Sequence, residues 1–570
     1  MAAGSVSLSA TQYRSRAHAL AQEGRADAAL EELERGVAEH PESGPLANSA
    51  GDFAMRAGDP EKAARHFANA VKLDGENSDF AINLSIALTA LGRFQEAIAV
   101  LERHEEHCSR DPRYCSARAN AARSSGDLAE AQRWYDLCLA AAPGQPRALH
   151  GRARVALERG DSDAVARFEA TLDANKGDPD AWLGYVEALD AAGRRDEARG
   201  LAEQLVAQAS HWIAALRALA QLRVGSGEHD FDDHFATAAT QRPDDPSIPQ
   251  AHVDMLEQHD RFADALAISK KAERAFPDLP QFRLRTATLA GYLGETDRAD
   301  ARYSALTQQD PARWLMEARF RLQTGECDRA AKLLDQLLEE RPGDIAGWAA
   351  RDLLWRLQGD ERADWLHGQE GLVQLVELPD AKQVLADAVP LLHRLHDSSA
   401  FPLGQSLRGG TQTRGILFRR PEPELRRLHD CLTAALETYR SKLPSADPAH
   451  PLLRHRDKPW AITSSWSVRL DGGGDHHTAH LHPEGIVSSA LYCELPPEMR
   501  DGSGTERAGW IELGRPPAKM HVELDAITAL EPREGFLALF PSTLYHGTRP
   551  FAGGRRMTVA FDVTAPSDAA

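Results

Sequence analysis

The sequence GRADAALEELERGVAEHP at residues 24–41 contains three marks that recur along most of this chain. A glycine opens the segment, an alanine follows five residues later, and a proline follows seventeen residues after the glycine. The glycine returns at a spacing close to 34 residues, at Gly24, Gly58, Gly92, Gly126, Gly160, Gly193, Gly227, Gly294, Gly325 and Gly359. Asp260 takes the place of one further glycine in this series. A repeated unit therefore organises the first two thirds of the chain.

Each mark has a structural reason in a hairpin of two helices. Glycine ends the first helix because it adopts the left-handed backbone conformation that other residues resist. Alanine early in the second helix lets the two backbones approach closely, and proline ends that helix. The alanines are Ala29, Ala63, Ala97, Ala131, Ala198, Ala265, Ala299 and Ala330, and the prolines are Pro41, Pro143, Pro277, Pro311 and Pro342. One hairpin cannot bury its apolar face alone, so we expect neighbouring hairpins to stack into a superhelix.

This pattern resembles the tetratricopeptide repeat (TPR) over roughly residues 10–365. The resemblance implies an all-α superhelical solenoid of about ten repeats, which we assign to residues 1–370. It also implies a concave groove that binds a protein or peptide partner. A solenoid that only dimerises or stiffens the molecule is the alternative.

Composition and charge exclude several classes of protein. A chain of 570 residues is long for one core, so we expect at least two structural units. The net charge of −19 argues against binding to a nucleic-acid backbone. Neither a signal-peptide pattern nor an apolar run long enough to span a membrane is visible, which predicts a cytoplasmic protein without a membrane span. The six cysteines form no C-x-x-C pair, which argues against a disulfide framework or a cysteine zinc site.

After Gly359 the repeat marks end, and the composition shifts toward glycine, aromatic residues and histidine. We place a helical junction at residues 371–400 and a second domain at residues 401–570. In that domain, residues 421–443 predict an amphipathic helix that covers a sheet. Strands are expected at residues 464–470, 486–495, 509–513, 536–540 and 557–563. Short strands between Gly and Pro turns predict a jelly-roll or cupin-like barrel, that is, a double-stranded β-helix with flanking helices.

Histidines gather in the segment HHTAHLHPEG, residues 476–485. His480 and His482 are two residues apart, so a strand would point both side chains to the same face, as two metal ligands require. A third histidine, His546, follows the expected strand FLALF and its turn. We expect His476 and His477 to be loop histidines that do not bind the metal.

An arginine with a hydroxyl residue two positions later lies in the last expected strand, RRMTVAFDV. Alternation places Arg556, Thr558 and Ala560 on one face of that strand. A planar guanidinium can donate two parallel hydrogen bonds to one carboxylate. An inward Arg556 is therefore a candidate carboxylate clamp.

These residues resemble the 2-oxoglutarate and Fe(II)-dependent dioxygenases, whose pattern is H-x-D, a distal His, and an Arg followed by Ser or Thr. His480, His546, Arg556 and Thr558 match that pattern. The segments SLRGGTQT, SWSVRL, HLHPEG, SSALY and LFPSTLYHGTRPF also resemble the 2OG-Fe(II) oxygenases that bacteria often carry behind TPR repeats. The resemblance covers about residues 400–565. It implies Fe(II), 2-oxoglutarate as co-substrate and O2, with Arg556 and Thr558 holding the far carboxylate of 2-oxoglutarate.

One position departs from the family pattern, because His482 replaces the metal-binding Asp or Glu. We expect His480, His482 and His546 to be the catalytic metal ligands, as imidazole is a competent iron ligand. Three alternatives stay open: Glu484 supplies a carboxylate, His482 lies behind the ligands without binding, or the cluster is a surface loop without metal.

The glycine-rich segment SLRGGTQT at residues 406–413 carries three polar candidates for substrate contact, Arg408, Gln412 and Thr413. Flexible backbone beside an arginine suits a polar ligand, although a tight turn with a surface arginine has the same composition. Trp466 and Trp510 are expected to pack in the barrel core.

Three functions are compatible with this sequence. The first is a hydroxylase of a protein or peptide substrate that the TPR solenoid holds, because a small metabolite needs no solenoid of this length. The second is an oxygenase of a small molecule or carrier-bound intermediate, with the repeats recruiting a partner enzyme. The third is a non-catalytic scaffold whose barrel is degenerate.

Overall fold

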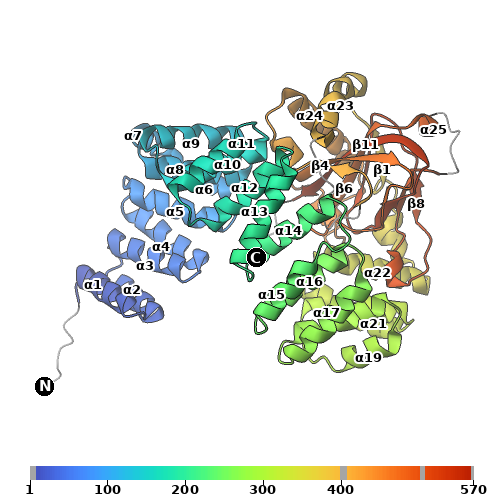
Figure 1. Cartoon of the computed structure of the whole chain (residues 1–570), viewed down its shortest axis with the longest axis horizontal. Helices are drawn as coiled ribbons and strands as arrows, with labels where there is room; N and C mark the ends of the chain where they lie inside the picture. Colours follow the sequence, from blue (N-terminus) through green and yellow to red (C-terminus); the bar gives the residue numbers. More distant parts are fainter. Residues whose placement is uncertain (1–7, 398–406, 501–506, 566–570) are drawn as a thin grey trace. The chain divides into compact units, whose positions relative to one another are not determined.

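The computed structural model describes residues 8–397, 407–500 and 507–565 (Figure 1). The chain divides into two compact units, one made of Met1–Ala188 with Arg419–Pro421 and the other of Leu189–Phe418 with Glu422–Ala570. Among the described residues, no helix combines the length and the apolar composition that crossing a membrane requires.

The first unit is a row of antiparallel helices. They are α1 (Ala10–Gln22), α2 (Ala26–Glu39), α3 (Gly44–Arg56), α4 (Pro60–Leu73), α5 (Ser78–Ala90), α6 (Phe94–Glu102), α7 (Glu105–Cys108), α8 (Pro112–Ser125), α9 (Leu128–Ala141), α10 (Pro146–Arg159) and α11 (Ala164–Ala174). The next helix, α12 (Pro179–Ala191), runs across the division between the units.

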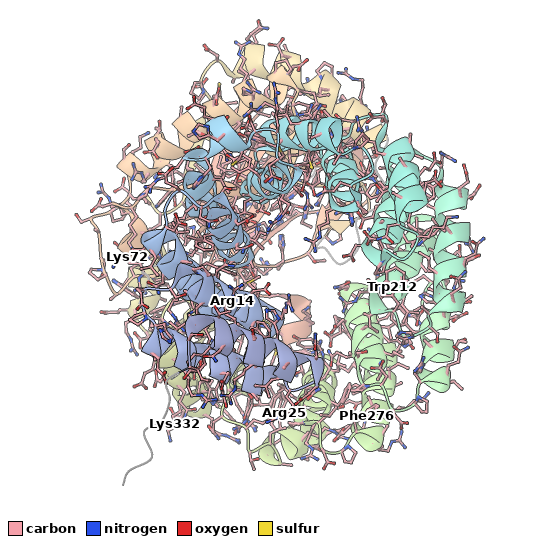
Figure 2. All side chains as sticks on the ribbon, turned by 90° about the vertical axis from the view of Figure 1, so that its left-hand side faces the viewer. Arg14, Arg25, Lys72, Trp212, Phe276 and Lys332 are labelled. Atoms are coloured by element: carbon pink, nitrogen blue, oxygen red, sulfur yellow. The ribbon has the colours of Figure 1, made fainter. Side chains whose placement is uncertain are left out.

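The second unit begins with further helices of the same kind. They are α13 (Arg195–Gln208), α14 (Ile213–Gly225), α15 (Asp233–Gln241), α16 (Ser247–Gln258), α17 (Phe262–Ala275), α18 (Pro280–Tyr292), α19 (Thr296–Ser304), α20 (Pro311–Gln323), α21 (Cys327–Glu340) and α22 (Ile345–Gln358). Figure 2 shows their side chains and labels Trp212, which precedes α14, and Phe276, which follows α17. The predicted all-α solenoid is confirmed over roughly residues 10–360.

The repeat marks act as the sequence predicts at nearly every position. All ten glycines of the series have a left-handed backbone, with φ between 66° and 93°. Asp260 adopts the same conformation, with φ of 56°, although it is not a glycine. Each of the eight marker alanines is 0% exposed, which lets paired helices pack closely. Pro311 is the exception among the prolines, because it begins α20 and its missing N–H costs nothing at a helix start.

The C-terminal part of the second unit is rich in antiparallel strands. A six-stranded sheet has the order β1-β9-β6-β11-β4-β3, a three-stranded sheet the order β10-β7-β8, and β2 pairs with β5. The strands are β1 (Gln374–Glu377), β2 (Leu407–Arg408), β3 (Thr411–Gln412), β4 (Ala461–Gly472), β5 (His476–His477), β6 (Val487–Glu494), β7 (Ile511–Leu513), β8 (Thr528–Leu530), β9 (Phe536–Pro541), β10 (His546–Thr548) and β11 (Gly553–Thr564). The five expected strands correspond to β4, β6, β7, β9 and β11.

Two helices cover one face of the large sheet, α23 (Ala381–Asp397) and α24 (Pro423–Ser441) (Figure 1). The apolar residues of α24 that the sequence singled out, Leu425, Leu428, Leu432, Ala435 and Leu436, are all buried there. They pack in one core with Met557, Val559 and Phe561 of β11. The opposite face of the sheet packs against β7 through Tyr492, Phe540 and Leu513, as two facing sheets of a jelly roll do.

The expected helical junction at residues 371–400 contributes more than a helix. Its residues Gln374–Glu377 form β1, which pairs antiparallel with β9 and lies at the edge of the large sheet. Strand formation there depends on a partner some 160 residues further along the chain. The short segment itself shows no alternation from which it could be predicted.

The last repeats and the barrel share a hydrophobic core within the second unit. Trp314, Ala318 and Leu322 of α20 belong to the same buried cluster as Met520 and Tyr545 of the β-rich part. His367, between the two parts, bonds to Asp352 Oδ1 at 2.9 Å and to Thr543 Oγ1 at 2.8 Å. The C-terminal repeats are therefore packed directly against the barrel.

Candidate metal centre

Three imidazoles meet between the two sheets. His546 is the first residue of β10, and its N–H and C=O bond to the C=O and N–H of His480, both at 3.0 Å. This bridge brings the segment after β5 against β10, and His482 follows two residues later. One ring nitrogen from each of His480, His482 and His546 lies within 4.8 Å of the others. The structure thus brings together the three histidines that the sequence singled out.

The Nδ1 atom of each ring donates a hydrogen bond to an oxygen atom of the protein. Nδ1 of His480 donates to Thr478 O at 2.8 Å, and Nδ1 of His546 donates to Leu544 O at 3.1 Å. Nδ1 of His482 donates to Asp562 Oδ1 at 2.6 Å. Because carbonyl and carboxylate oxygens only accept, the proton of each neutral ring sits on Nδ1. The Nε2 atoms point toward one another, with Nε2 of His480 3.1 Å from Nε2 of His482, which is the position that metal ligands need.

Burial disfavours the charged form of His480 and His546. Burial, together with the neighbouring His482, lowers the pKa of His480 to about 3. Burial and the charge of His480 likewise hold the pKa of His546 well below its usual value. Neutral imidazoles can bind a cation without first losing a proton at neutral pH.

A cavity of about 340 Å³ opens beside the three rings. Arg556, Thr558 and Ala560 line it, which is the face that strand alternation predicts for β11. Arg556 is 3% exposed and its guanidinium lies over the ring of Tyr492, 5.5 Å from the centroid. Its Nε has no hydrogen-bond partner, and no carboxylate pairs with it among the residues that the structure describes. A buried guanidinium facing a cavity without an anion suits a ligand carboxylate.

The donor set therefore fits an iron centre with a dicarboxylate beside it. Three Nε2 atoms on one side of the cavity leave space for further ligands, as a catalytic metal site requires. Glu484, the alternative carboxylate ligand, is exposed and lies outside the cluster. Asp562 lies behind His482 and holds its ring.

Three features of the site were not foreseen from the sequence. Asp562 continues the inward series of β11, so the same alternation that selected Arg556 could have found it. Trp466, expected in the barrel core, lines the cavity with its ring 5.3 Å from that of His482. His477, expected in a loop, lies in β5 and also lines the cavity, with its ring 5.9 Å from that of His480.

Gln412 and Thr413 of the glycine-rich segment lie beside β4. Gln412 pairs with Val468 of β4, and Thr413 Oγ1 accepts a hydrogen bond from Ser467 N at 2.9 Å. Neither residue lines the cavity in the described part of the chain. The backbone of Arg408 belongs to β2, while its side chain and Ser406 lie outside the described residues.

Family comparisons assign both parts of the chain. Residues 464–562 match the family model described as "Putative 2OG-Fe(II) oxygenase". Tetratricopeptide repeat models match residues 54–121, 162–222 and 284–345, as well as 112–136 and 146–168. The chain carries TPR repeats and a C-terminal 2OG-Fe(II) oxygenase domain. That domain implies Fe(II) and 2-oxoglutarate, and the three-histidine cluster is compatible with iron.

Similar proteins overlap this chain only in part. Protein FlbA of Caulobacter vibrioides is 32% identical over 186 residues, which are 31% of this chain and 31% of FlbA. The match thus spans about a third of that relative. The type IV pilus biogenesis factor PilW has 17% identity and a TM-score of 0.35, covering 37% of this chain and 98% of PilW. PilF of Pseudomonas aeruginosa has 15% identity and a TM-score of 0.32, covering 36% of this chain and 95% of PilF.

Proposed function

We propose that this protein is an Fe(II)- and 2-oxoglutarate-dependent dioxygenase that hydroxylates a protein or peptide substrate held by its TPR repeats. His480, His482 and His546 would hold the iron through their Nε2 atoms. Arg556 and Thr558 would hold the far carboxylate of 2-oxoglutarate. When bound, iron and 2-oxoglutarate supply the chemistry: O2 hydroxylates a C–H bond while 2-oxoglutarate is converted to succinate and CO2.

One observation carries this proposal: three converging imidazoles face the same cavity as a buried guanidinium that has no ion-pair partner among the described residues. The chain's own contribution is orientation. Thr478 O, Asp562 and Leu544 O fix the three rings through Nδ1, so that their Nε2 atoms converge before any ligand arrives. Trp466, Val468 and Ile511 supply an apolar wall that excludes water from the cavity.

The repeats favour a polymeric substrate. TPR repeats generally mediate protein–protein contacts, and the C-terminal repeats are packed directly against the oxygenase domain. A solenoid that shares a core with the barrel is well placed to present a bound segment to it.

The decisive experiment measures metal content and 2-oxoglutarate binding in wild type, His546→Ala and a control, His229→Ala. The side chain of His229 is 90% exposed and lies outside the cluster, so its variant should behave as wild type. We expect His546→Ala to lose iron. Zinc in place of iron in the purified wild type, with no affinity for 2-oxoglutarate, would refute the assignment, because three histidines also suit zinc.

Activity then separates the alternatives. Purified protein with Fe(II), 2-oxoglutarate and candidate peptides should form succinate and add one oxygen atom to a peptide, seen by mass spectrometry. Turnover of a small or carrier-bound molecule alone would support the second function instead. Absence of both metal binding and succinate would leave the non-catalytic scaffold.

A further inference from the structure

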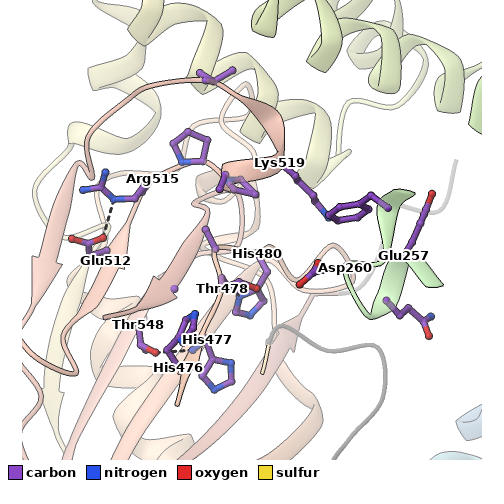
Figure 3. A pocket seen from close by; sticks show the side chains of 18 of the residues that line it. Glu257, Asp260, His476, His477, Thr478, His480, Glu512, Arg515, Lys519 and Thr548 are labelled. Carbon is purple, nitrogen blue, oxygen red and sulfur yellow. Dashed lines mark hydrogen bonds and ion pairs between the residues drawn. The ribbon is translucent and has the colours of Figure 1, made fainter. Parts of the chain in front are cut away.

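A second and larger cavity, of about 1420 Å³, lies between the repeats and the oxygenase domain within the second unit. Its repeat side is formed by α14, α16, α17 and α18, from which Glu257 and Phe262 reach the cavity. Its other side is the segment 512–525, which begins in β7 and carries Arg515 and Lys519. Figure 3 shows Glu257 and Asp260 of the repeats facing the same space as His480 and Thr478. We name this cavity the cleft.

The cleft adjoins the metal site. His477, His480, Gly547 and Thr548 line both the cleft and the smaller cavity. His480 is one of the three converging imidazoles. A segment lying in the cleft would therefore contact residues that also line the inner cavity.

Specific contacts hold the two walls of the cleft together. His521 Nε2 donates to Tyr292 O at 2.9 Å, and Lys519 lies over the Phe262 ring, 5.4 Å from its centroid. Arg356 of α22 donates to Gly514 O at 2.5 Å and also to Asp525 O. These contacts come from both ends of segment 512–525, so the cleft is a built feature of the second unit.

The size of the cleft suits a polymer better than a metabolite. Pockets for small molecules have volumes of about 300–1,000 Å³, a range that includes the inner cavity but not the cleft. An inner chamber for the co-substrate and one side chain, behind an outer cleft for a longer segment, is the arrangement that a polypeptide substrate needs.

The charge of the cleft favours a basic segment. Six carboxylates line it, Asp254, Glu257, Asp260, Glu512, Glu523 and Asp525, against four cationic side chains. Arg217 and Arg285 pair with Asp254, Arg285 also pairs with Glu257, and Arg515 pairs with Glu512 and Asp525. Six carboxylates against four cationic side chains still leave a surplus of negative charge. Glu523 is exposed and makes no ion pair within the described residues, whereas the Asp525 side chain is 99% exposed and lies 3.7 Å from Arg515. Both side chains are exposed to solvent, where an arriving ligand can contact them.

We propose that the cleft is the substrate channel of the oxygenase and that it takes an extended polypeptide segment with basic side chains. This assignment rests on the proposed function, and it adds the binding surface and the charge of the substrate. Glu523 and Asp525 attract the segment, and the passage lined by His480 and Thr548 admits one side chain to the inner cavity.

The test uses the full chain with Glu523→Lys and Asp525→Lys combined. The matched control combines Asp457→Lys and Glu531→Lys, which reverse two exposed carboxylates of the same unit outside both cavities. The probes are fluorescein-labelled synthetic peptides of equal length in which the charged positions are all lysine, all glutamate or replaced by serine. Binding is followed by fluorescence anisotropy without added metal, and succinate formation is measured with and without peptide.

We expect the lysine peptide to bind wild type and the control variant more tightly than the other two peptides. The cleft variant should bind it about tenfold or more weakly, since each charge reversal replaces an attraction by a repulsion. Peptide-free succinate formation should be equal in wild type and the control variant. Equal binding of the lysine peptide to wild type and cleft variant, or preference for the glutamate peptide, would overturn the proposal. Loss of succinate in every protein while the binding pattern holds would instead refute the oxygenase function alone.

Discussion

His482 stands where the family pattern has a metal-binding carboxylate, and Asp562 holds its ring. Replacing Asp562 by asparagine tests whether this support strengthens metal binding. Asp562 Oδ1 accepts the Nδ1 proton of His482 at 2.6 Å, and its Oδ2 accepts from Ser464 Oγ at 2.7 Å. The side chain is buried, so water cannot replace the lost charge. We expect weaker metal binding, because a negative charge behind an imidazole raises its basicity toward the cation.

The expected loss of metal affinity follows from the type of hydrogen bond that Asp562 makes with His482. A hydrogen bond to a charged group contributes about 1.5–3 kcal/mol, which corresponds to about 10- to 150-fold in an equilibrium constant. Asparagine can still accept a hydrogen bond from His482 through its amide oxygen. We therefore expect Asp562→Asn to lower metal affinity about tenfold and Asp562→Ala to lower it about 100-fold. Ser464→Ala is the matched control, because it removes the second bond of Asp562 and leaves His482 held.

The assay is an anaerobic titration with Co(II), whose absorbance reports coordination, repeated for His482→Ala. We expect the order wild type and Ser464→Ala, then Asp562→Asn, then Asp562→Ala, then His482→Ala, from tightest to weakest. If both Asp562 variants and His482→Ala bind Co(II) as tightly as wild type, His482 is not a ligand and the three-histidine assignment fails.

Three further variants test the clamp, the repeats and the pH response. Arg556→Met should weaken 2-oxoglutarate binding by about 100-fold or more while Co(II) affinity stays constant, measured by calorimetry, because no other cationic side chain of the described residues lines the cavity. Gly58→Ala should lower the melting temperature by a few degrees through its φ of 78°, whereas Gly144→Ala, with equally open space and no left-handed backbone, should not. Burial alone would raise the pKa of Asp232, but its bond to His252 and nearby positive charge lower it to about 2. Its contribution to stability is therefore full above about pH 4 and lost as the pH falls toward 2, and Asp232→Asn should flatten that part of a urea-unfolding profile against pH.

Local rules predicted what depends on local structure. Glycine at the helix ends and alternation in β11 are properties of a few consecutive residues, and the structure follows both. Alternation also extends to Asp562, which lies two residues beyond Ala560 on the same face of β11. Domain boundaries at residues 370 and 400 stay predictions.

Features that join distant segments could not be read from the sequence. Strand β1 forms because it pairs with β9, and its four residues are too few for an alternating pattern to predict a strand. The cleft requires Glu257 and Glu523 on opposite walls, and their positions in the sequence give no sign that they face each other. The position of Trp466 at the cavity likewise depends on His482 from another segment.

The shared core between repeats and barrel decides how the role of the repeats can be studied. Deleting residues 1–370 would remove α20, against which Met520 and Tyr545 are buried, together with the Tyr292 carbonyl that holds His521. It would also remove His367 from Thr543, leaving a buried hydroxyl unpaired. Loss of activity in such a fragment would therefore report a damaged barrel as readily as a missing substrate site. Charge reversal at Glu523 and Asp525 separates the two effects, because these exposed side chains can change while the apolar contacts of segment 512–525 stay in place.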